Sequence, residues 1–209
     1  MTKAYTYLVA GLPELSLEFS SSDPTTGVKR FDCDKLIDTI TENLDKEDVK
    51  YLKFLLLGLD NPMPYFFRRA SKSKNRFIRE YFLMDTFLRN VQAGVVARKK
   101  GEDPHAWLVG DNTTDFEPDS EVEDVRQILD ILEIKDILER EQQLDLFRWK
   151  KVDEINLFNY FDTDTVLAFV VKAYLVSRWM MLDKERGSGM FKKLLKDCRG
   201  VSEYTRLPE

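Results

Sequence analysis

The side chains that most often carry catalysis or bind metals are sparse in this chain. His105 is the single histidine, so no pair of histidines can hold zinc. Cys33 and Cys198 are the only cysteines, and they lack the CxxC spacing of a metal or redox site. A Cys–His nucleophile would need one of them to meet His105, which follows Pro104 in an expected loop, and two reduced packing cysteines are the simpler interpretation. We therefore expect neither a metal centre nor thiol catalysis.

Glycine-rich and acidic segments offer the remaining chemistry. The run Gly187–Lys192 has the composition of a phosphate-binding loop, but it lacks the GxxxxGK[ST] spacing and follows a predicted helix. The acidic segment 111–119 lacks the glycine and final glutamate of a calcium loop. Carboxylate clusters such as Glu121, Glu123 and Asp124 are expected by chance among 37 acidic residues. We expect no enzyme, no catalytic residue, no cofactor and no small-molecule substrate.

The most asymmetric charge feature is a basic run with no acidic residue before Glu80. It could be a solvated loop over core aromatic residues, a docking site for an acidic protein, or a nucleic-acid site that stacks bases on Phe66, Phe67 and Phe77. The net charge of -5 argues against general coating of nucleic acid or of an anionic membrane. The candidate partner-binding residues are Arg68, Arg69, Lys72, Lys74, Arg76 and Arg79.

Helices must position this run. Arg76 to Gly101 has the longest helical pattern, with apolar residues recurring at alternating steps of four and three. Val166 to Val176 is apolar nearly all round, which places that helix at the centre of a bundle. Nine glycines and seven prolines leave little room for the turns of an all-β fold. The sequence predicts an all-α, multi-helix bundle of related helical units.

The N-terminal half supplies further helices. Residues 5–12 are either a short strand or a helix ended by Pro13, and the pattern leaves this choice open. A helical hairpin is expected from Asp32, with Asp45 capping its second helix. Pro62 and Pro64 interrupt regular helix, and residues 71–74 have the composition of a loop.

The C-terminal half follows the same logic. Ser120 and Glu123 have capping-box spacing for a helix with Val122 on its apolar face. A helix from Asp136 to about Phe158 is expected, with core candidates Leu138, Leu146, Trp149, Val152 and Ile155. Asp162 or Thr163 should cap the next helix, which Gly187 and Gly189 should end.

We expect one helical domain over 1–209, with sub-units of about 1–110 and 120–200 joined by an acidic connection. One internal echo supports related units: aligning Tyr81 with Tyr160 also aligns Asp85 with Asp164. This echo is either a chance match between apolar helices or a degenerate repeat. The N-terminus lacks the features of a signal peptide, and the most apolar window contains Lys172, so membrane contact should occur only through a partner.

Several stretches resemble a bacterial family of proteins of unknown function encoded among the subunits of V-type (A/V-type) ATPases. The matching stretches are Tyr5–Pro13, Leu88–Arg98, Trp149–Glu154, Tyr160–Asp162 and Arg178–Gly187. That family resembles a shortened form of the C subunit of these ATPases, which is called the d subunit in eukaryotes. The resemblance implies a helical protein that couples the central rotor shaft to the membrane ring, without chemistry of its own.

This resemblance gives the leading functional hypothesis and its rivals. The expected partners are the central-stalk and membrane-ring subunits of the ATPase, and the expected location is cytoplasmic, at the inner membrane through that complex. One rival is an assembly factor or regulator of the same ATPase. The other is an unrelated helical binding module for protein or, less favoured, for nucleic acid.

Overall fold

The computed structural model describes residues 5–17, 31–60, 64–109 and 122–181. These residues form eight α-helices and one 3-10 helix, with no strand in the described part, so the all-α expectation is confirmed. The elements are α1 (Thr6–Ala10), α2 (Cys33–Asn43), α3 (Lys46–Asp60), α4 (Pro64–Ala70), α5 (Arg76–Lys100), η1 (Pro104–Trp107), α6 (Glu123–Glu133), α7 (Ile137–Asn156) and α8 (Thr163–Met180).

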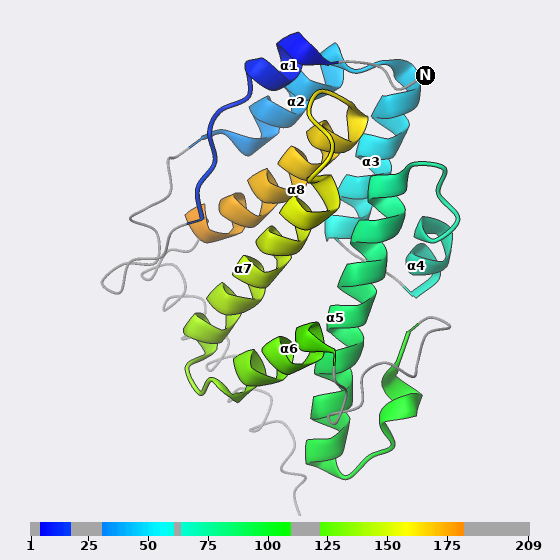
Figure 1. Ribbon diagram of the computed structural model, residues 1–209, viewed down its shortest axis with the longest axis vertical. Helices are drawn as coiled ribbons and strands as arrows, with labels where there is room; N and C mark the ends of the chain where they lie inside the picture. The colour runs from blue at the N-terminus through cyan, green and yellow to red at the C-terminus, as the bar shows by residue number, and fades with distance from the viewer. Residues whose placement is uncertain (1–4, 18–30, 61–63, 110–121, 182–209) are drawn as a thin grey trace, which may run out of the picture.

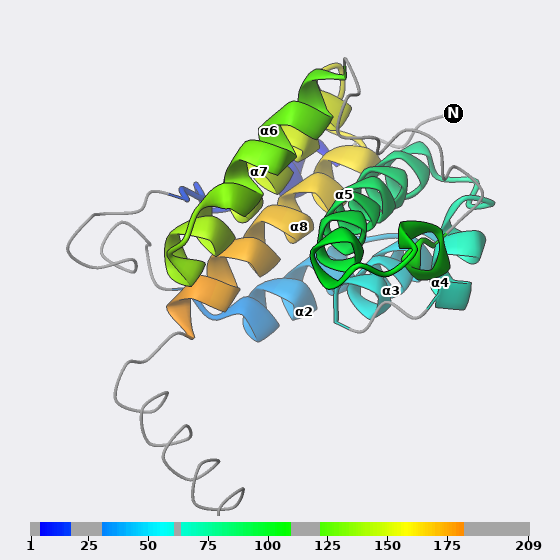
Figure 2. The same cartoon turned by 90° about the horizontal axis from the view of Figure 1, so that it is seen from below.

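The helices lie in layers around α8 and α5. Seen from below, α6 and α7 cover one side of these two helices, and α2, α3 and α4 lie on the other (Figure 2). Figure 1 shows α1 crossing above α8 at the end where α8 begins. The largest apolar cluster joins α2, α3, α4, α5 and α8, and a smaller one joins α5, α6 and α7.

Side-chain caps set where the long helices begin. The carboxylate or amide oxygens of Asp32, Asn75, Asp136 and Asp162 each accept a backbone N–H three residues further on, which satisfies a donor that the helix leaves open. Gly101 ends α5 in the left-handed conformation, at φ 73°. The long helix, the start of a helix at Asp32 and the cap at Asp162 are therefore as predicted.

The central position of α8 is also confirmed. Its side chains from Val166 to Val176 are mostly buried, and α8 packs against α2, α3, α5 and α7. Thus a helix from the second expected sub-unit shares its core with helices of the first. The acidic connection that would divide them lies mostly outside the described residues.

The structure decides or corrects several element boundaries. Residues 6–10 are helical, which decides the open choice at the N-terminus. Helix α4 begins at Pro64, where a proline fits because the first helical turn needs no donor from it. His105 lies in a short 3-10 helix rather than a loop. Helix α8 ends at Met180, before Gly187 and Gly189, which lie outside the described residues.

Two core assignments also need correction. Leu138 is 44% exposed, and Leu144 and Phe147 supply the buried face of α7 in its place. Val122 is 47% exposed and precedes α6, while Ser120 of the expected capping box lies outside the described residues.

The sequence similarity that aligns Tyr81 with Tyr160 does not correspond to equivalent positions in the two helices. Tyr81 is buried in the second turn of α5, whereas Tyr160 precedes α8 and is 68% exposed. The helices themselves do pack together, as expected. No helix among the described residues is long and apolar enough to cross a bilayer.

Candidate docking surface

The structure separates the six basic residues into two groups. Arg76 belongs to the first, because it is held between three helices. Its guanidinium donates to Glu80 within α5 at 3.0 Å and to the backbone oxygen of Ile155 in α7 at 3.1 Å. It also lies 3.5 Å from a carboxylate oxygen of Asp164 at the start of α8. Arg76 therefore joins the beginnings of α5 and α8 to the end of α7.

Arg79 has a structural role as well. Its Nη1 donates to the backbone oxygens of Ser73, at 2.6 Å, and Lys74, at 3.0 Å. These bonds fix the loop between α4 and α5, because they satisfy two carbonyl groups outside any helix. Two of the six predicted binding residues thus shape the surface more than they offer free charge.

The second group keeps its charge available. Arg68, Arg69, Lys72 and Lys74 are exposed, and no carboxylate pairs with them in the described part of the chain. Arg69 lies over the ring of Phe54, 5.5 Å from its centre, which orients the guanidinium without neutralising it. These four residues form a contiguous stretch from the end of α4 to the start of α5.

Helix α3 contributes cations that sequence reasoning missed. Lys50 and Lys53 are exposed, and neither has an ion pair within the described ranges. Lys50 and Lys74 both line a cleft of about 330 Å³, which we call the basic cleft. Its lining residues are Lys50, Tyr51, Phe54, Arg69, Ser73 and Lys74. The recurrence of Lys46, Lys50 and Lys53 at helical spacing was the signal that could have revealed this face.

Close packing at Gly58 brings α3 and α4 together beside the cleft. A Cβ atom there would lie 2.3 Å from the ring of Phe66 and 2.4 Å from the ring of Phe82. Phe66 in turn stacks on Phe54, with 4.5 Å between ring centres. The absent side chain at Gly58 therefore lets the aromatic residues seat α4, and Arg69 with it, against α3.

The aromatic residues proposed for base stacking are not available at this surface. Phe77 is fully buried, and Phe66 and Phe67 are 2% and 8% exposed. They pack in the main core, where the rings of Phe66 and Phe67 contact each other and Phe82. Only the half-buried rings of Tyr51 and Phe54 line the basic cleft. The cleft thus offers cations to an anionic partner and few flat surfaces to a nucleic-acid base.

A second charged group is centred on two buried carboxylates between α5, α7 and α8, and its Arg89 and Arg178 reach the surface. Asp145 has no exposed surface and accepts from Arg148 at 2.8 Å, from Arg178 at 3.3 Å and from the indole nitrogen of Trp179 at 2.9 Å. Asp85 accepts from Arg89 at 2.7 Å. We call these residues the buried polar cluster.

Arg148 joins the two carboxylates of this cluster. Its Nε lies 3.7 Å from Asp85, while its Nη1 bonds Asp145. Burial alone would lower the pKa of Arg148, but Asp145 and Asp85 outweigh it and raise that pKa above its usual value. The guanidinium is therefore charged and bridges α5 to α7, and Asp145 extends the bridge to α8.

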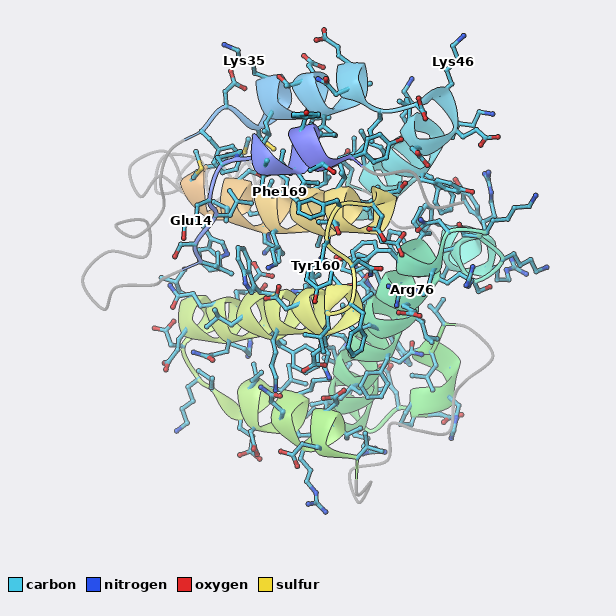
Figure 3. The ribbon with its side chains drawn as sticks, turned by 45° about the horizontal axis from the view of Figure 1, so that its top comes forward. Glu14, Lys35, Lys46, Arg76, Tyr160 and Phe169 are labelled. Carbon is cyan, nitrogen blue, oxygen red and sulfur yellow. The ribbon has the colours of Figure 1, made fainter. Side chains whose placement is uncertain are left out.

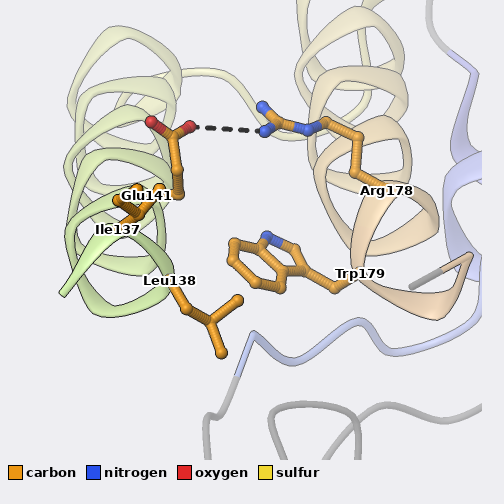
Figure 4. Close-up of a pocket in the computed structure, with 5 residues that line it drawn as sticks. All are labelled: Ile137, Leu138, Glu141, Arg178 and Trp179. Atoms are coloured by element: carbon orange, nitrogen blue, oxygen red, sulfur yellow. Dashed lines mark ion pairs between the residues drawn. The ribbon is translucent and has the colours of Figure 1, made fainter. Parts of the chain in front are cut away.

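An apolar groove opens on the outer side of the buried polar cluster. Ile137, Leu138 and Glu141 of α7 face Arg178 and Trp179 of α8 across a cavity of about 330 Å³ (Figure 4). Arg178 and Glu141 form an ion pair across it at 3.6 Å. Because these two charges neutralise each other, the groove presents apolar surface more than free charge.

Metal binding would need a cluster of ligating side chains. Among the described residues, no three side chains of histidine, cysteine, aspartate or glutamate come close enough to hold a metal ion. The basic cleft contains no carboxylate or histidine in its lining. What this arrangement can do chemically is attract and orient an anionic group.

Comparison with known proteins gives one family. The family model described as "Protein of unknown function (DUF2764)" matches residues 60–200, which include α4 to α8 and all six predicted binding residues. No curated protein and no solved structure matches the chain. The chain belongs to the DUF2764 family.

Proposed function

We propose that this protein is a non-catalytic structural component of a V-type ATPase, similar to its C subunit, that couples the central rotor shaft to the membrane ring. The proposal starts from the five stretches that resemble ATPase-associated proteins, among them Leu88–Arg98 in α5 and Arg178–Gly187 from the end of α8. The matched family carries no stated function, so the physical properties of the fold supply the remaining support.

The observation that carries the proposal is the buried polar cluster. A part that transmits torque must resist bending and sliding of its helices, and close-packed interiors give such stiffness. Asp145 alone holds partners from α7 and α8, and Arg148 extends the cluster to Asp85 in α5. The geometry of such a cluster is satisfied in one register only, because a sliding helix would leave a buried charge without its partner.

The basic cleft supports the second part of the proposal, which is docking. Its cations lie on α3, α4 and the loop that follows α4, and they have no carboxylate partner within the described ranges. Free cations attract an acidic surface over a distance and suppress wrong partners. We propose that the cleft binds an acidic surface of a neighbouring ATPase subunit, and that the protein reaches the cytoplasmic side of the inner membrane only through this complex.

Affinity purification from the native cells tests the proposal. A tagged full-length copy should co-purify central-stalk and membrane-ring subunits of the ATPase. A purification that yields none of these subunits, from cells that express the ATPase, would overturn the proposal. An untagged strain is the control for unspecific recovery.

Two other functions predict different results in the same assay. An assembly factor or regulator would be recovered in amounts far below those of the ATPase subunits and only in some growth phases. A nucleic-acid module would bind oligonucleotides with a steep salt dependence, since phosphate contacts release counterions. The half-buried Tyr51 ring in the basic cleft is the feature that would favour this last function.

A further inference from the structure

The loop between α7 and α8 exposes a cluster of large apolar side chains to solvent. Phe158 is 86% exposed, Tyr160 68%, Leu157 62% and Phe161 46%. Residues 157–161, which we call the aromatic loop, thus place four large side chains in solvent within five positions. Exposed apolar residues that occur singly need no explanation, but a cluster of this kind marks an interaction site.

The aromatic loop is held in place by hydrogen bonds at both ends. At its start, Arg76 donates to the backbone oxygen of Ile155, at 3.1 Å, and the N–H of Asn159 donates to the oxygen of Asn156, at 2.9 Å. At its end, the N–H of Tyr5 donates to the oxygen of Phe161. Because the backbone is fixed before binding, a partner would lose little entropy by ordering it.

The carboxylates beside the aromatic loop already have partners within the protein. Asp162 accepts from the backbone and hydroxyl of Thr165, and Asp164 accepts from Asn75 at 2.6 Å and pairs with Arg76. These contacts occupy the carboxylates beside the loop.

The contacts of Asp164 with Asn75 and Arg76 also connect the aromatic loop to the basic cleft. Asn75 and Arg76 directly follow Lys74, which lines the cleft. Figure 3 labels Tyr160 on the α7–α8 loop and Arg76 at the start of α5 beside it. The free charge next to the exposed aromatic residues is therefore positive.

We propose that the aromatic loop is the anchor of the docking surface, and that Phe158 and Tyr160 insert into an apolar recess of a partner protein whose rim is acidic. The identity of that partner as an ATPase subunit rests on the function proposed above. Aromatic side chains in the centre of an interface commonly carry most of its affinity, and charged residues at the rim set orientation. The aromatic loop supplies the aromatic centre of the docking surface, and the basic cleft supplies its charged rim.

Two other occupants fit these charges less well. A second copy that docks symmetrically through this surface would bring Lys72 and Lys74 towards the same residues of its mate, and like charges repel. An anionic membrane would attract the lysines, but the chain as a whole carries a net charge of -5. Both occupants give distinct results in the experiment that follows.

The experiment uses the full-length chain in its native cells, in two forms. In the first, Phe158→Ser and Tyr160→Ser are combined, and recovery of ATPase subunits is compared with that of wild type and of Leu83→Ser. Leu83 is 58% exposed in α5 and so controls for loss of an exposed apolar side chain. We expect recovery to fall about tenfold or more for the double variant only. The thermal midpoint of the purified double variant should match that of wild type, because the changed side chains are exposed.

The second form carries the photocrosslinker p-benzoylphenylalanine in place of Phe158 or, as control, of Leu83. We expect position 158 to crosslink to one protein, at an apolar segment flanked by aspartate or glutamate, and position 83 not to do so. Liposomes of phosphatidylcholine and phosphatidylglycerol test direct lipid binding by sedimentation, and light scattering of the purified protein tests self-association.

The outcomes separate this inference from the proposed function. Undiminished ATPase recovery by the double variant would overturn the inference and leave the proposed function standing. If wild type recovers no ATPase, the proposed function fails, and the crosslink then decides. A crosslink from position 158 to an apolar segment of another protein that is flanked by acidic residues supports the inference, and the absence of any protein crosslink overturns it. Liposome binding or dimer formation that the double variant loses would overturn it in favour of a lipid or a second copy.

Discussion

Arginine occurs both in the buried polar cluster and in the basic cleft, but its partners differ between the two. Inside, Arg148 and Asp145 lie within hydrogen-bond distance of each other and have little or no exposed surface. Outside, Lys50, Arg69 and Lys74 line an open cleft that contains no carboxylate. Charge thus has two arrangements in this fold: partnered charges hold the helices in register, and unpaired charges face solvent, where the proposed partner would dock.

The largest effect should follow from breaking the inner group. Asp145→Ala removes the buried acceptor that Arg148 and the Trp179 indole share, while the half-exposed Arg178 keeps its ion pair with Glu141. We expect the free energy of unfolding to fall by about 3–5 kcal/mol, as for other buried pairs that lose one member. Urea denaturation followed by circular dichroism measures it.

Asp153→Ala is the matched control for that change. Asp153 also pairs with a cation, Lys172 of α8, but its side chain is 57% exposed. The cost should stay below about 1 kcal/mol, because solvent screens the pair. Equal losses from the two variants would mean that the buried polar cluster is no more important to the fold than a surface pair.

The next effect concerns how the outer group is positioned. Gly58→Ala would place a methyl group 2.3 Å from the Phe66 ring, so α4 must shift away from α3. We expect destabilisation of about 1–3 kcal/mol, typical of overpacking, despite the better helix propensity of alanine. Thermal unfolding measures the loss, and a variant as stable as wild type would contradict the close packing described for α3 and α4.

Sequence patterns predicted the helices whose caps and periodicity act locally. The long helix α5 was recognisable because its apolar period and Gly101 both act within a few residues. Helix α4 was missed, since a proline that ends one helix can also begin the next, and the sequence does not distinguish the two. Leu138 was misplaced because it lines the open groove between α7 and α8, and the sequence does not show that this groove is left unfilled.

The candidate surface was predicted in part. The basic run lies from the end of α4 into α5, as the sequence shows, and whether it binds a partner stays a prediction. Two of its members are instead used within the fold, because Arg76 bonds Ile155 and Arg79 bonds the backbone oxygen of Ser73. Lys50 was missed because it comes close to Lys74 only when α3 and α4 fold together. Long-range contacts such as that between Arg148 and Asp85 have no local signal at all.

Charge reversal in the cleft should weaken binding and leave stability nearly unchanged. For Lys50→Glu combined with Lys74→Glu, recovery of ATPase subunits should fall roughly tenfold, because an acidic partner would meet like charge. The unfolding free energy should change by about 0.5 kcal/mol or less, since both residues are exposed.

Lys35→Glu combined with Lys135→Glu is the control for total charge, because it also reverses two exposed lysines and neither lines the cleft. The same loss of recovery from this control would show that net charge, and not the basic cleft, governs binding.

The smallest effect on stability is expected from the half-buried hydroxyl group of Tyr5. Tyr5 donates its hydroxyl hydrogen to Asp48, and burial together with this bond raises the pKa of Tyr5 to about 12. Because the folded pKa lies above the ordinary value of 10.0, this contribution is present below pH 10 and is lost as the pH rises towards 12.

Tyr5→Phe should therefore cost about 0.5–1.5 kcal/mol at neutral pH, the range of a single hydrogen bond. Its difference from wild type should shrink as the pH is raised from 10 to 12 in urea titrations. A difference that stays constant across this range would mean that the bond between Tyr5 and α3 does not depend on the Tyr5 proton.

In the proposed function, this rigid helical protein belongs permanently to the ATPase. Purification of the complex through a tag on one of its catalytic subunits, followed by quantitative mass spectrometry, measures whether it does. We expect the protein in a fixed ratio to the central-stalk subunits, in every growth phase and after moderate salt washing. Its absence from the intact, active complex would rule out the proposed structural role.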